Sequence, residues 1–188
     1  MAHLILASSS PRRRELLTQV GLSFDILSPD IDERVLPNEA AMDYVRRLAT
    51  EKAQAVLAQS PHAIIIAADT TVSVDGQIIG KPESKEHAFS IWQQLSGRRH
   101  HVYSGVCVAK TGASQTVVVS TEVEFSSMQP HDMESYWNSQ EPLGKAGAYA
   151  IQGLGAQFVP AIHGSYSNVV GLPLFETLQL LKAVKAQN

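Results

Sequence analysis

The sequence predicts an α/β protein whose sheet contains both parallel and antiparallel strands. Segments typical of strands alternate with segments typical of helices along the chain, as in proteins built from layers of both. Two long segments of alternating polarity, residues 102–110 and 116–125, follow one another closely and predict a central antiparallel hairpin. The 188 residues contain no repeat, low-complexity tract or linker, so we expect a single domain over residues 1–188.

The N-terminal third predicts a strand–helix–strand unit and then a long helix. Ser10 is typical of an N-cap and Pro11 of a first helical position, while Gly21 is typical of a helix C-terminus. Apolar residues at helical spacing indicate the longer helix. In order, we expect a strand at 4–7, a helix from Pro11 to about Gly21, a strand at 24–27, an acidic loop at 30–38 and a helix at 39–59.

The rest of the chain continues this alternation. A continuous apolar run suits a strand covered on both faces, and Asp75-Gly76 is a typical hairpin turn. We expect a strand at 63–68 that ends at Asp69, a hairpin at 72–79, a helix from Ser84 to about Leu95, the long hairpin, a short helix at 130–139, a glycine-rich loop at 141–155, a strand at 158–162, a second loop at 164–171 and a helix at 173–186.

Composition excludes several classes of protein. The net charge of -3 gives no general attraction to nucleic acid or to an anionic membrane, so a polyphosphate ligand needs a local basic site or a metal. The lone Cys107 lies in an apolar run and is expected to be a buried, inert thiol. The N-terminus lacks the pattern of a signal peptide, and no apolar run approaches the length of a membrane span, so we expect a cytoplasmic protein.

A hydroxyl-rich turn joins the first strand to the first helix and is followed by two arginines. Helix N-termini present unpaired N–H groups, which bind anions. Arg12 and Arg13 oppose the helix dipole there, yet they are well placed to hold phosphates. The pattern predicts either an anion site that includes Ser8, Arg12 and Arg13, or a capped helix with a solvated basic face. It lacks the Walker A spacing.

Carboxylates occur at two places that suit a metal ion. Asp69 follows an apolar strand, and side chains at strand ends project into the crevice where open α/β sheets bind ligands. It can hold a hard cation or accept a proton from water, with Thr70 beside it to contact a substrate. The clustered carboxylates Asp30, Asp32 and Glu33 can complete a magnesium site with Asp69, because Mg²⁺ prefers oxygen ligands. The alternatives are an Asx turn and a solvated acidic loop.

Lysines and a glutamine near loops can complete a binding site. Lys52, Lys81 and Lys145 are each either a phosphate ligand or a surface lysine, and Pro82 keeps Lys81 extended. Gln152, in a glycine-rich segment, carries a donor and an acceptor that suit the edge of a pyrimidine base. Residues 164–173 form a second wall of the pocket or cap the last helix. Adjacent His100 and His101 point to opposite faces of a strand, which excludes their joint binding of zinc.

Taken together, these segments resemble the Maf family of nucleoside triphosphate pyrophosphatases. Each motif is short, but they occur in the order of the family and cover essentially the whole chain. The matching stretches are residues 6–13, 68–70, 80–82, 100–105, 141–153 and 164–173.

The resemblance implies a mixed, elongated sheet flanked by helices, with two lobes around a deep cleft, a fold shared with inosine triphosphate pyrophosphatases, and often a homodimer. It also implies cleavage between the α- and β-phosphates with a divalent cation, Mg²⁺ or Mn²⁺. By position, Asp69 matches the family's proposed proton acceptor. The family's polar cleft residues are matched by Ser8, Arg13, Glu33, Lys52 and Lys81.

Three residues resemble the branch of the family that acts on dTTP and UTP rather than on 7-methyl-GTP. These are Arg12, Thr70 and Gln152, which would select the base. Two positions depart from the family pattern: Gly144 stands where an acidic residue is common, and Ser104 replaces a usual threonine while keeping the hydroxyl.

The function predicted from the sequence is therefore hydrolysis of dTTP and UTP, and of modified pyrimidine nucleotides, to the monophosphate and pyrophosphate. One alternative is a nucleotide-sensing or nucleic-acid-binding inhibitor of septum formation that does not hydrolyse nucleotides. Another is a pyrophosphatase that acts on 7-methyl-GTP or ITP. The acidic net charge and the cleft carboxylates predict no stable nucleic-acid partner, and no membrane partner is expected.

Overall fold

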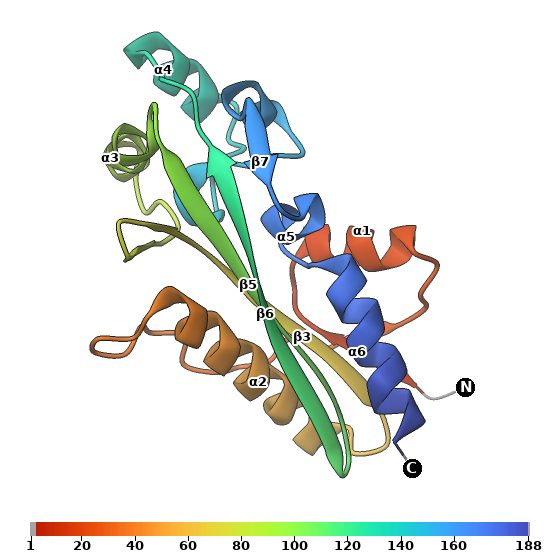
Figure 1. The fold of residues 1–188 in the computed structure, drawn as a ribbon. Coiled ribbons are helices and arrows are strands. Elements are labelled where there is room, and N and C mark those ends of the chain that lie inside the picture. Colours follow the sequence, from red (N-terminus) through yellow and green to blue (C-terminus); the bar gives the residue numbers. More distant parts are fainter. Residues whose placement is uncertain (1–2, 188) are drawn as a thin grey trace.

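The computed structural model describes residues 3–187 and consists of one twisted, elongated sheet with helices on both faces (Figure 1). The strand order is β2-β1-β3-β5-β6-β7, and β4 pairs with β3 outside this path. This mixed α/β architecture confirms the predicted fold class. The strands are β1 (Leu4–Ala7), β2 (Asp25–Ile26), β3 (Ile64–Val74), β4 (Gln77–Ile79), β5 (Arg99–Lys110), β6 (Ala113–Glu124) and β7 (Ala161–His163).

The sheet is parallel at one end and antiparallel elsewhere. β1 pairs in parallel with both β2 and β3, while β3, β5, β6 and β7 pair in antiparallel succession. The long hairpin β5–β6 turns at Gly112, whose φ of 81° is readily adopted by glycine. Asp75 and Gly76, with φ of 51° and 76°, form the predicted tight turn between β3 and β4.

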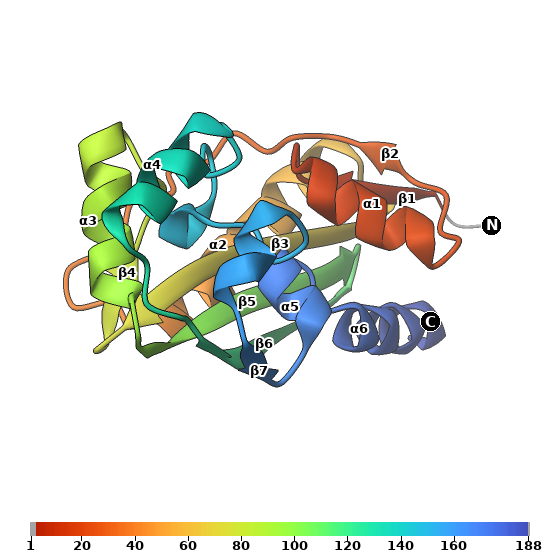
Figure 2. The ribbon, with the colours of Figure 1, turned by 90° about the horizontal axis from the view of Figure 1, so that it is seen from above.

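Helices cover the two faces of the sheet unequally (Figures 1 and 2). One face is covered by a single helix, α2. Its small side chains, such as Ala49 and Ala53, pack against Ile65 and Ala67 of β3. The opposite face packs against the larger core cluster, which takes in residues of the remaining helices. These are α1 (Pro11–Gln19), α3 (Lys85–Leu95), α4 (Pro130–Asn138), α5 (Tyr166–Val170) and α6 (Leu174–Ala186), with α2 spanning Ala41–Gln59 and two short 3₁₀ segments, η1 (Ala146–Ala148) and η2 (Leu154–Phe158).

Three element predictions were wrong. The strand expected to end at Asp69 continues to Val74, because Asp69 and Thr70 stay paired with Gly105 and Ser104 of β5, and this tertiary pairing overrides the local turn signal. The loop expected at 164–171 contains α5, whose N-cap Ser165 accepts a bond from the Asn168 N–H. The strand expected at 158–162 is instead at Ala161–His163.

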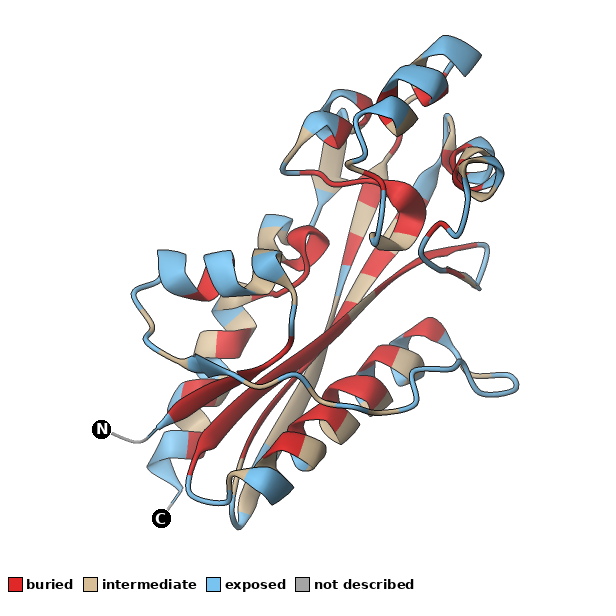
Figure 3. Cartoon of the chain, turned by 180° about the vertical axis from the view of Figure 1, so that it is seen from behind, coloured by how far each residue is buried: buried red, intermediate tan, exposed pale blue. Residues whose placement is uncertain are grey.

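Strand β3 is the buried axis of the molecule (Figure 3). One of its edges pairs with β5 over nearly its whole length. The other edge pairs with β1 as far as Ala67 and with β4 only from Val72 onward. The intervening residues, 68–71, therefore have no strand beside them on that edge. This gap places a polar stretch of a buried strand at an opening in the sheet.

Candidate active site

A cavity of about 620 Å³ lies at this gap in the sheet. Its walls come from the β1–α1 turn, the loop before α2, α2 itself, β3, the segment after β4, the loop around η1 and the end of α5. Every residue predicted to form the site contributes to its lining: Ser8, Arg12, Arg13, Glu33, Lys52, Asp69, Thr70, Lys81 and Gln152. The sequence motifs thus converge in space, although the role of each residue in binding or catalysis stays a prediction.

Asp69 lies in a group of three charged side chains. The Lys52 Nζ donates to Asp69 Oδ1 at 2.7 Å and lies 2.7 Å from Glu33 Oε1. Asp69 and Lys52 are only 7% and 6% exposed, so both charges depend on this pairing. Burial tends to raise the pKa of the Glu33 carboxyl, but Lys52, with Lys81 and Arg13, outweighs it and holds the pKa below the ordinary value.

The backbone around Glu33 is attached to helix α2. The Tyr44 hydroxyl donates to the Glu33 carbonyl at 3.0 Å, and Arg47 bonds both the Arg34 carbonyl and the Glu39 carboxylate. Burial, together with the nearby Asp69 and Glu33 charges, raises the pKa of Tyr44 to about 12, so its hydroxyl stays a donor. The same helix therefore positions Lys52 and the acidic loop.

Arg13 connects three parts of the chain rather than projecting freely into the cavity. Its Nε donates to the Gly171 carbonyl at 2.8 Å, and Nη1 donates to the Ala68 carbonyl at 2.8 Å. Further bonds reach the hydroxyls of Ser8 and Thr70, both at 3.2 Å. Four of its five N–H groups are thus used inside the protein, and one Nη2 donor remains for a ligand.

Thr70 belongs to a polar network that the sequence did not indicate. Its Oγ1 lies 2.7 Å from Ser104 Oγ and 3.2 Å from the Gly171 carbonyl, besides accepting from Arg13. Ser104 in turn donates to the carbonyl of Asn168, a fully buried residue whose amide nitrogen bonds the Val102 carbonyl. Because its hydroxyl is saturated by protein groups, Thr70 is positioned to fix the cavity wall.

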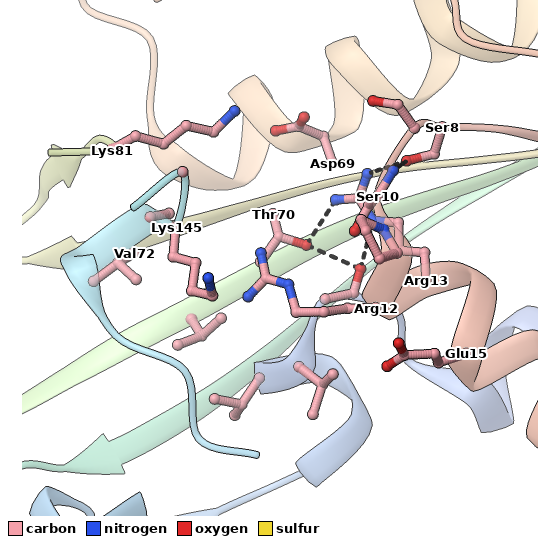
Figure 4. A pocket seen from close by; sticks show the side chains of 18 of the residues that line it. Ser8, Ser10, Arg12, Arg13, Glu15, Asp69, Thr70, Val72, Lys81 and Lys145 are labelled. Atoms are coloured by element: carbon pink, nitrogen blue, oxygen red, sulfur yellow. Dashed lines mark hydrogen bonds between the residues drawn. The ribbon is translucent and has the colours of Figure 1, made fainter. Parts of the chain in front are cut away.

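Three cations extend into the cavity without an ion-pair partner among residues 3–187. Figure 4 shows Lys81 directed toward Asp69, and the charged ends of Arg12 and Lys145 close to each other. Burial lowers the pKa of Arg12, and burial together with the Arg12 charge lowers the pKa of Lys145. Unpaired, mutually repelling cations in one cavity indicate an anionic ligand.

The start of helix α1 adds neutral donors to the same wall. Ser10 occupies the N-cap position as predicted, but its side chain makes no capping bond. Ser8 instead accepts the Ser10 N–H at 3.2 Å, which folds the turn over the helix end. The first-turn N–H groups have no acceptor within the helix and suit phosphate oxygens.

Gln152 lies at the exposed tip of the loop before η2, where it lines the cavity. Tyr149 lines the same wall, and its hydroxyl lies 2.8 Å from Nε2 of the buried His100. His101 is half-exposed on the other face of β5, as predicted from the alternation along a strand. Of the cavity residues, Lys145 and Tyr149 carried the weakest sequence signals, a lysine and an aromatic residue in a glycine-rich segment.

The donor set suits a divalent cation of the magnesium type. Asp69 and Glu33 each place an oxygen 2.7 Å from the same ammonium, so these oxygens can be no farther apart than twice that distance. Hard cations such as Mg²⁺ are commonly held by one or two carboxylates together with waters and phosphate oxygens. Residues 3–187 contain no cluster of three or more acidic, histidine or cysteine ligands. Asp30 does not line the cavity, and Asp32 pairs with Arg34.

Fold and cavity together define an α/β protein with a deep, strongly charged cleft for a polyanionic ligand. The family model described as "Maf-like protein" matches residues 3–184, and the chain belongs to this family. No helix within residues 3–187 is both long and apolar enough to cross a membrane.

Curated relatives resemble this chain over nearly its whole length. A dTTP/UTP pyrophosphatase of Acinetobacter baylyi is 64% identical over 183 residues, covering 97% of this chain and 100% of the relative. Proteins of the same name from Vibrio parahaemolyticus and Myxococcus xanthus are 50% and 51% identical, covering 95% of this chain and 95% and 91% of their own. A solved HAM1 protein from Coxiella burnetii superposes with a TM-score of 0.53 at 15% identity over 100% of both chains, which shows a shared fold.

Proposed function

We propose that this protein hydrolyses dTTP and UTP to the nucleoside monophosphate and pyrophosphate. The observation that carries the proposal is the convergence, in one cavity, of the Asp69–Lys52–Glu33 group with three unpaired cations. The names of relatives that are 50–64% identical over nearly the full chain support the same activity.

In this proposal the cations and the helix terminus hold the triphosphate. Lys81, Lys145 and Arg12 contact phosphate oxygens, and the first-turn N–H groups of α1 add neutral donors. Arg13 keeps the wall rigid and contributes its one remaining donor. Fixed charges around the phosphates also stabilise the charge that develops as the bond breaks, without reorganisation during the reaction.

Asp69 is the proposed proton acceptor. A water molecule attacks the α-phosphorus, its proton passes to a carboxylate oxygen of Asp69, and a new P–O bond forms. The bond between the α-phosphorus and the α,β-bridging oxygen breaks, and its electron pair leaves with pyrophosphate. The Lys52 ammonium, whose Nζ lies 2.7 Å from Asp69 Oδ1, holds this carboxylate in place in the cavity, and the other carboxylate oxygen is left to take the proton.

A divalent cation, Mg²⁺ or Mn²⁺, would be held by Asp69 and Glu33. When bound, it neutralises phosphate charge and favours departure of pyrophosphate. Lys52 contacts one oxygen of each of these two carboxylates at 2.7 Å and so keeps the pair close together. Gln152 would read the pyrimidine edge from the rim of the cavity, because its amide both donates and accepts.

The proposal is tested by measuring pyrophosphate release from a panel of nucleotides, including dTTP, UTP, 7-methyl-GTP and ITP, with Mg²⁺ or Mn²⁺ and with a chelator. We expect dTTP and UTP to be hydrolysed fastest, and chelation to abolish the reaction. Preferred hydrolysis of 7-methyl-GTP or ITP would assign another substrate. Tight, strongly salt-dependent binding of nucleic acid without hydrolysis of any nucleotide would contradict an enzymatic role.

Replacement of the proposed proton acceptor gives the sharpest single test. We expect Asp69→Asn to lower kcat by at least about 100-fold, the usual scale of a general base, while the protein stays folded because Lys52 keeps its bond to Glu33. Asp43→Asn removes an exposed acid at the start of α2 and serves as the matched control. Near-normal turnover by the Asp69 variant would remove this residue from the mechanism.

A further inference from the structure

Glu141 lies outside the cavity but is bonded to the loop that carries Gln152. Its Oε2 accepts the Leu154 N–H at 2.8 Å, and its Oε1 accepts the Gly155 N–H at 2.9 Å. Oε1 also accepts the Tyr136 hydroxyl at 2.7 Å. One carboxylate therefore accepts hydrogen bonds from two consecutive backbone N–H groups, which have no acceptor in a helix or strand.

Tyr136 extends this arrangement to the other side of Gln152. Its buried hydroxyl accepts the Ala150 N–H at 3.1 Å while donating to Glu141. The Gly153 N–H closes the turn onto the Ala150 carbonyl at 3.2 Å. Backbone groups both before and after Gln152 are thus fixed by Tyr136 and Glu141, and only the Gln152 side chain is left exposed at the cavity.

Glu141 and Tyr136 lie so close to the backbone after Gln152 that only glycine fits at positions 153 and 155. A Cβ at Gly153 would lie 2.1 Å from Glu141 Oε2, and one at Gly155 would lie 2.5 Å from the Tyr136 hydroxyl. Neither distance is sterically possible. The Gln-Gly-Leu-Gly segment therefore has the small residues needed for a carboxylate and a phenol to lie directly against its backbone.

We propose that Glu141 is a positioning residue for base selection, which holds Gln152 in one orientation toward the nucleotide. This inference rests on the proposed function, because Gln152 is taken to read the base. A preorganised amide discriminates between bases better than a mobile one, since a flexible loop can rearrange to satisfy the wrong base. Neither Glu141 nor Tyr136 lines the cavity, and their bonds to the loop give them a route to Gln152. The Glu141 charge also acts on the nearby Lys145, so a test must include a variant that keeps this charge.

The test compares three variants. Glu141→Gln removes the charge, and Gly153→Ala keeps the acid but displaces it. The control, Glu134→Gln, removes an exposed acid of α4 that pairs with Lys85. An amide nitrogen at position 141 cannot accept an N–H bond. We expect Glu141→Gln and Gly153→Ala to speed amide exchange in residues 154–155 about tenfold and to lower the preference for dTTP over GTP in kcat/KM about tenfold, mainly through KM. Glu134→Gln should do neither.

Coupling to Gln152 separates positioning from general support of the fold. If Glu141 acts through Gln152, the double variant Glu141→Gln/Gln152→Ala should show the same dTTP preference as Gln152→Ala alone. Additive losses would overturn the inference. So would unchanged exchange at residues 154–155, or faster exchange with an unchanged preference.

A failure of the proposed function has a different signature. If the wild-type chain releases pyrophosphate from no nucleotide, calorimetry with the non-hydrolysable α,β-imido analogues of dUTP and GTP decides instead. Weaker discrimination between the two analogues by Glu141→Gln would support the positioning role without hydrolysis. Equal discrimination by the variant and the wild type, or binding of neither analogue by the wild type, would overturn it.

Discussion

Asp69 and Thr70 are neighbours on β3 whose side chains leave opposite faces of the sheet. Asp69 faces α2, where it meets Lys52, whereas Thr70 faces the side of Arg13 and Gly171. Both still reach one cavity, because that edge of β3 has no neighbouring strand at residues 68–71. Two consecutive residues on a single stretch of extended chain can thus contact different partners and still line the same cavity.

Buried His100 predicts a pH dependence of stability. Its ring is 1% exposed and bonded to Tyr149, and burial, assisted by His101, lowers its pKa to about 4. Folding therefore favours the neutral ring. The resulting stability is complete above the ordinary pKa of 6.5 and is lost as the pH falls toward 4, amounting to about 2 kcal/mol between pH 7 and pH 5.

We expect His100→Gln to remove most of this slope when the free energy of unfolding is measured by urea denaturation at pH 7 and pH 5. The variant should also be less stable at pH 7, because the ring packs against Phe125 and Tyr149. His101→Gln, on the half-exposed face, is the control and should keep nearly the full slope. Equal slopes in wild type and His100→Gln would contradict this account.

Helix α2 and strand β5 show how close packing of elements determines the site. Gly105 pairs with Asp69 across the sheet, and a Cβ at this position would lie 2.2 Å from the Val45 carbonyl of α2. The backbone of the helix thus rests directly on the backbone of the strand. That contact sets the distance from α2 to β3, and therefore the distance from Lys52 to Asp69.

Gly105→Ala should push α2 away from the sheet, because the clash is with backbone that cannot rotate aside. We expect a loss of about 2 kcal/mol in the free energy of unfolding, within the usual range for overpacked cores, and a fall in kcat through displacement of Lys52. Gly80→Ala is the control for stability, since a Cβ there meets no atom within 4 Å and its φ is not positive. Full stability of Gly105→Ala would show that α2 can shift freely.

At the scale of the whole molecule, the cavity joins segments from Ser8 to Gly171, so that nearly the full length of the chain contributes to one site. The two apolar clusters lie on opposite faces of the same sheet and share its strands. Neither could persist if the sheet opened. The lobes on either side of the cavity should therefore unfold together.

Ligand binding should accordingly stabilise the molecule as one unit. With Mg²⁺ and the α,β-imido analogue of dUTP at about 100 times its Kd, the gain is about 2.7 kcal/mol, which corresponds to a rise in Tm of about 5–10 °C for a chain of this size. Differential scanning calorimetry should show a single transition that moves as a whole. A split transition, with only one part shifted, would show independent lobes.

The order of the elements was largely predictable because it depends on local patterns. Ser84 caps α3 as expected, and the turns at Asp75-Gly76 and Gly112 lie where their residues predict them. The predicted site residues also converge on one cavity. This was expected from the resemblance to the Maf family, since each motif alone left a purely structural alternative open. Glu141, Ser104 and Asn168 could not be recognised as loop or wall supports, since their partners are distant or are backbone groups.

Sequence patterns alone were enough to predict the alternation of strands and helices, the burial of Cys107, the opposite directions of His100 and His101, and the kinds of charged groups available to a polyphosphate. Three features depend on the folded arrangement: β3 continues past Asp69, most Arg13 donors are used in internal bonds, and Lys52 bridges two carboxylates. The physical reason is that hydrophobic periodicity and capping act between near neighbours in the chain. Strand pairing and the partners of buried charges depend on which distant segments meet.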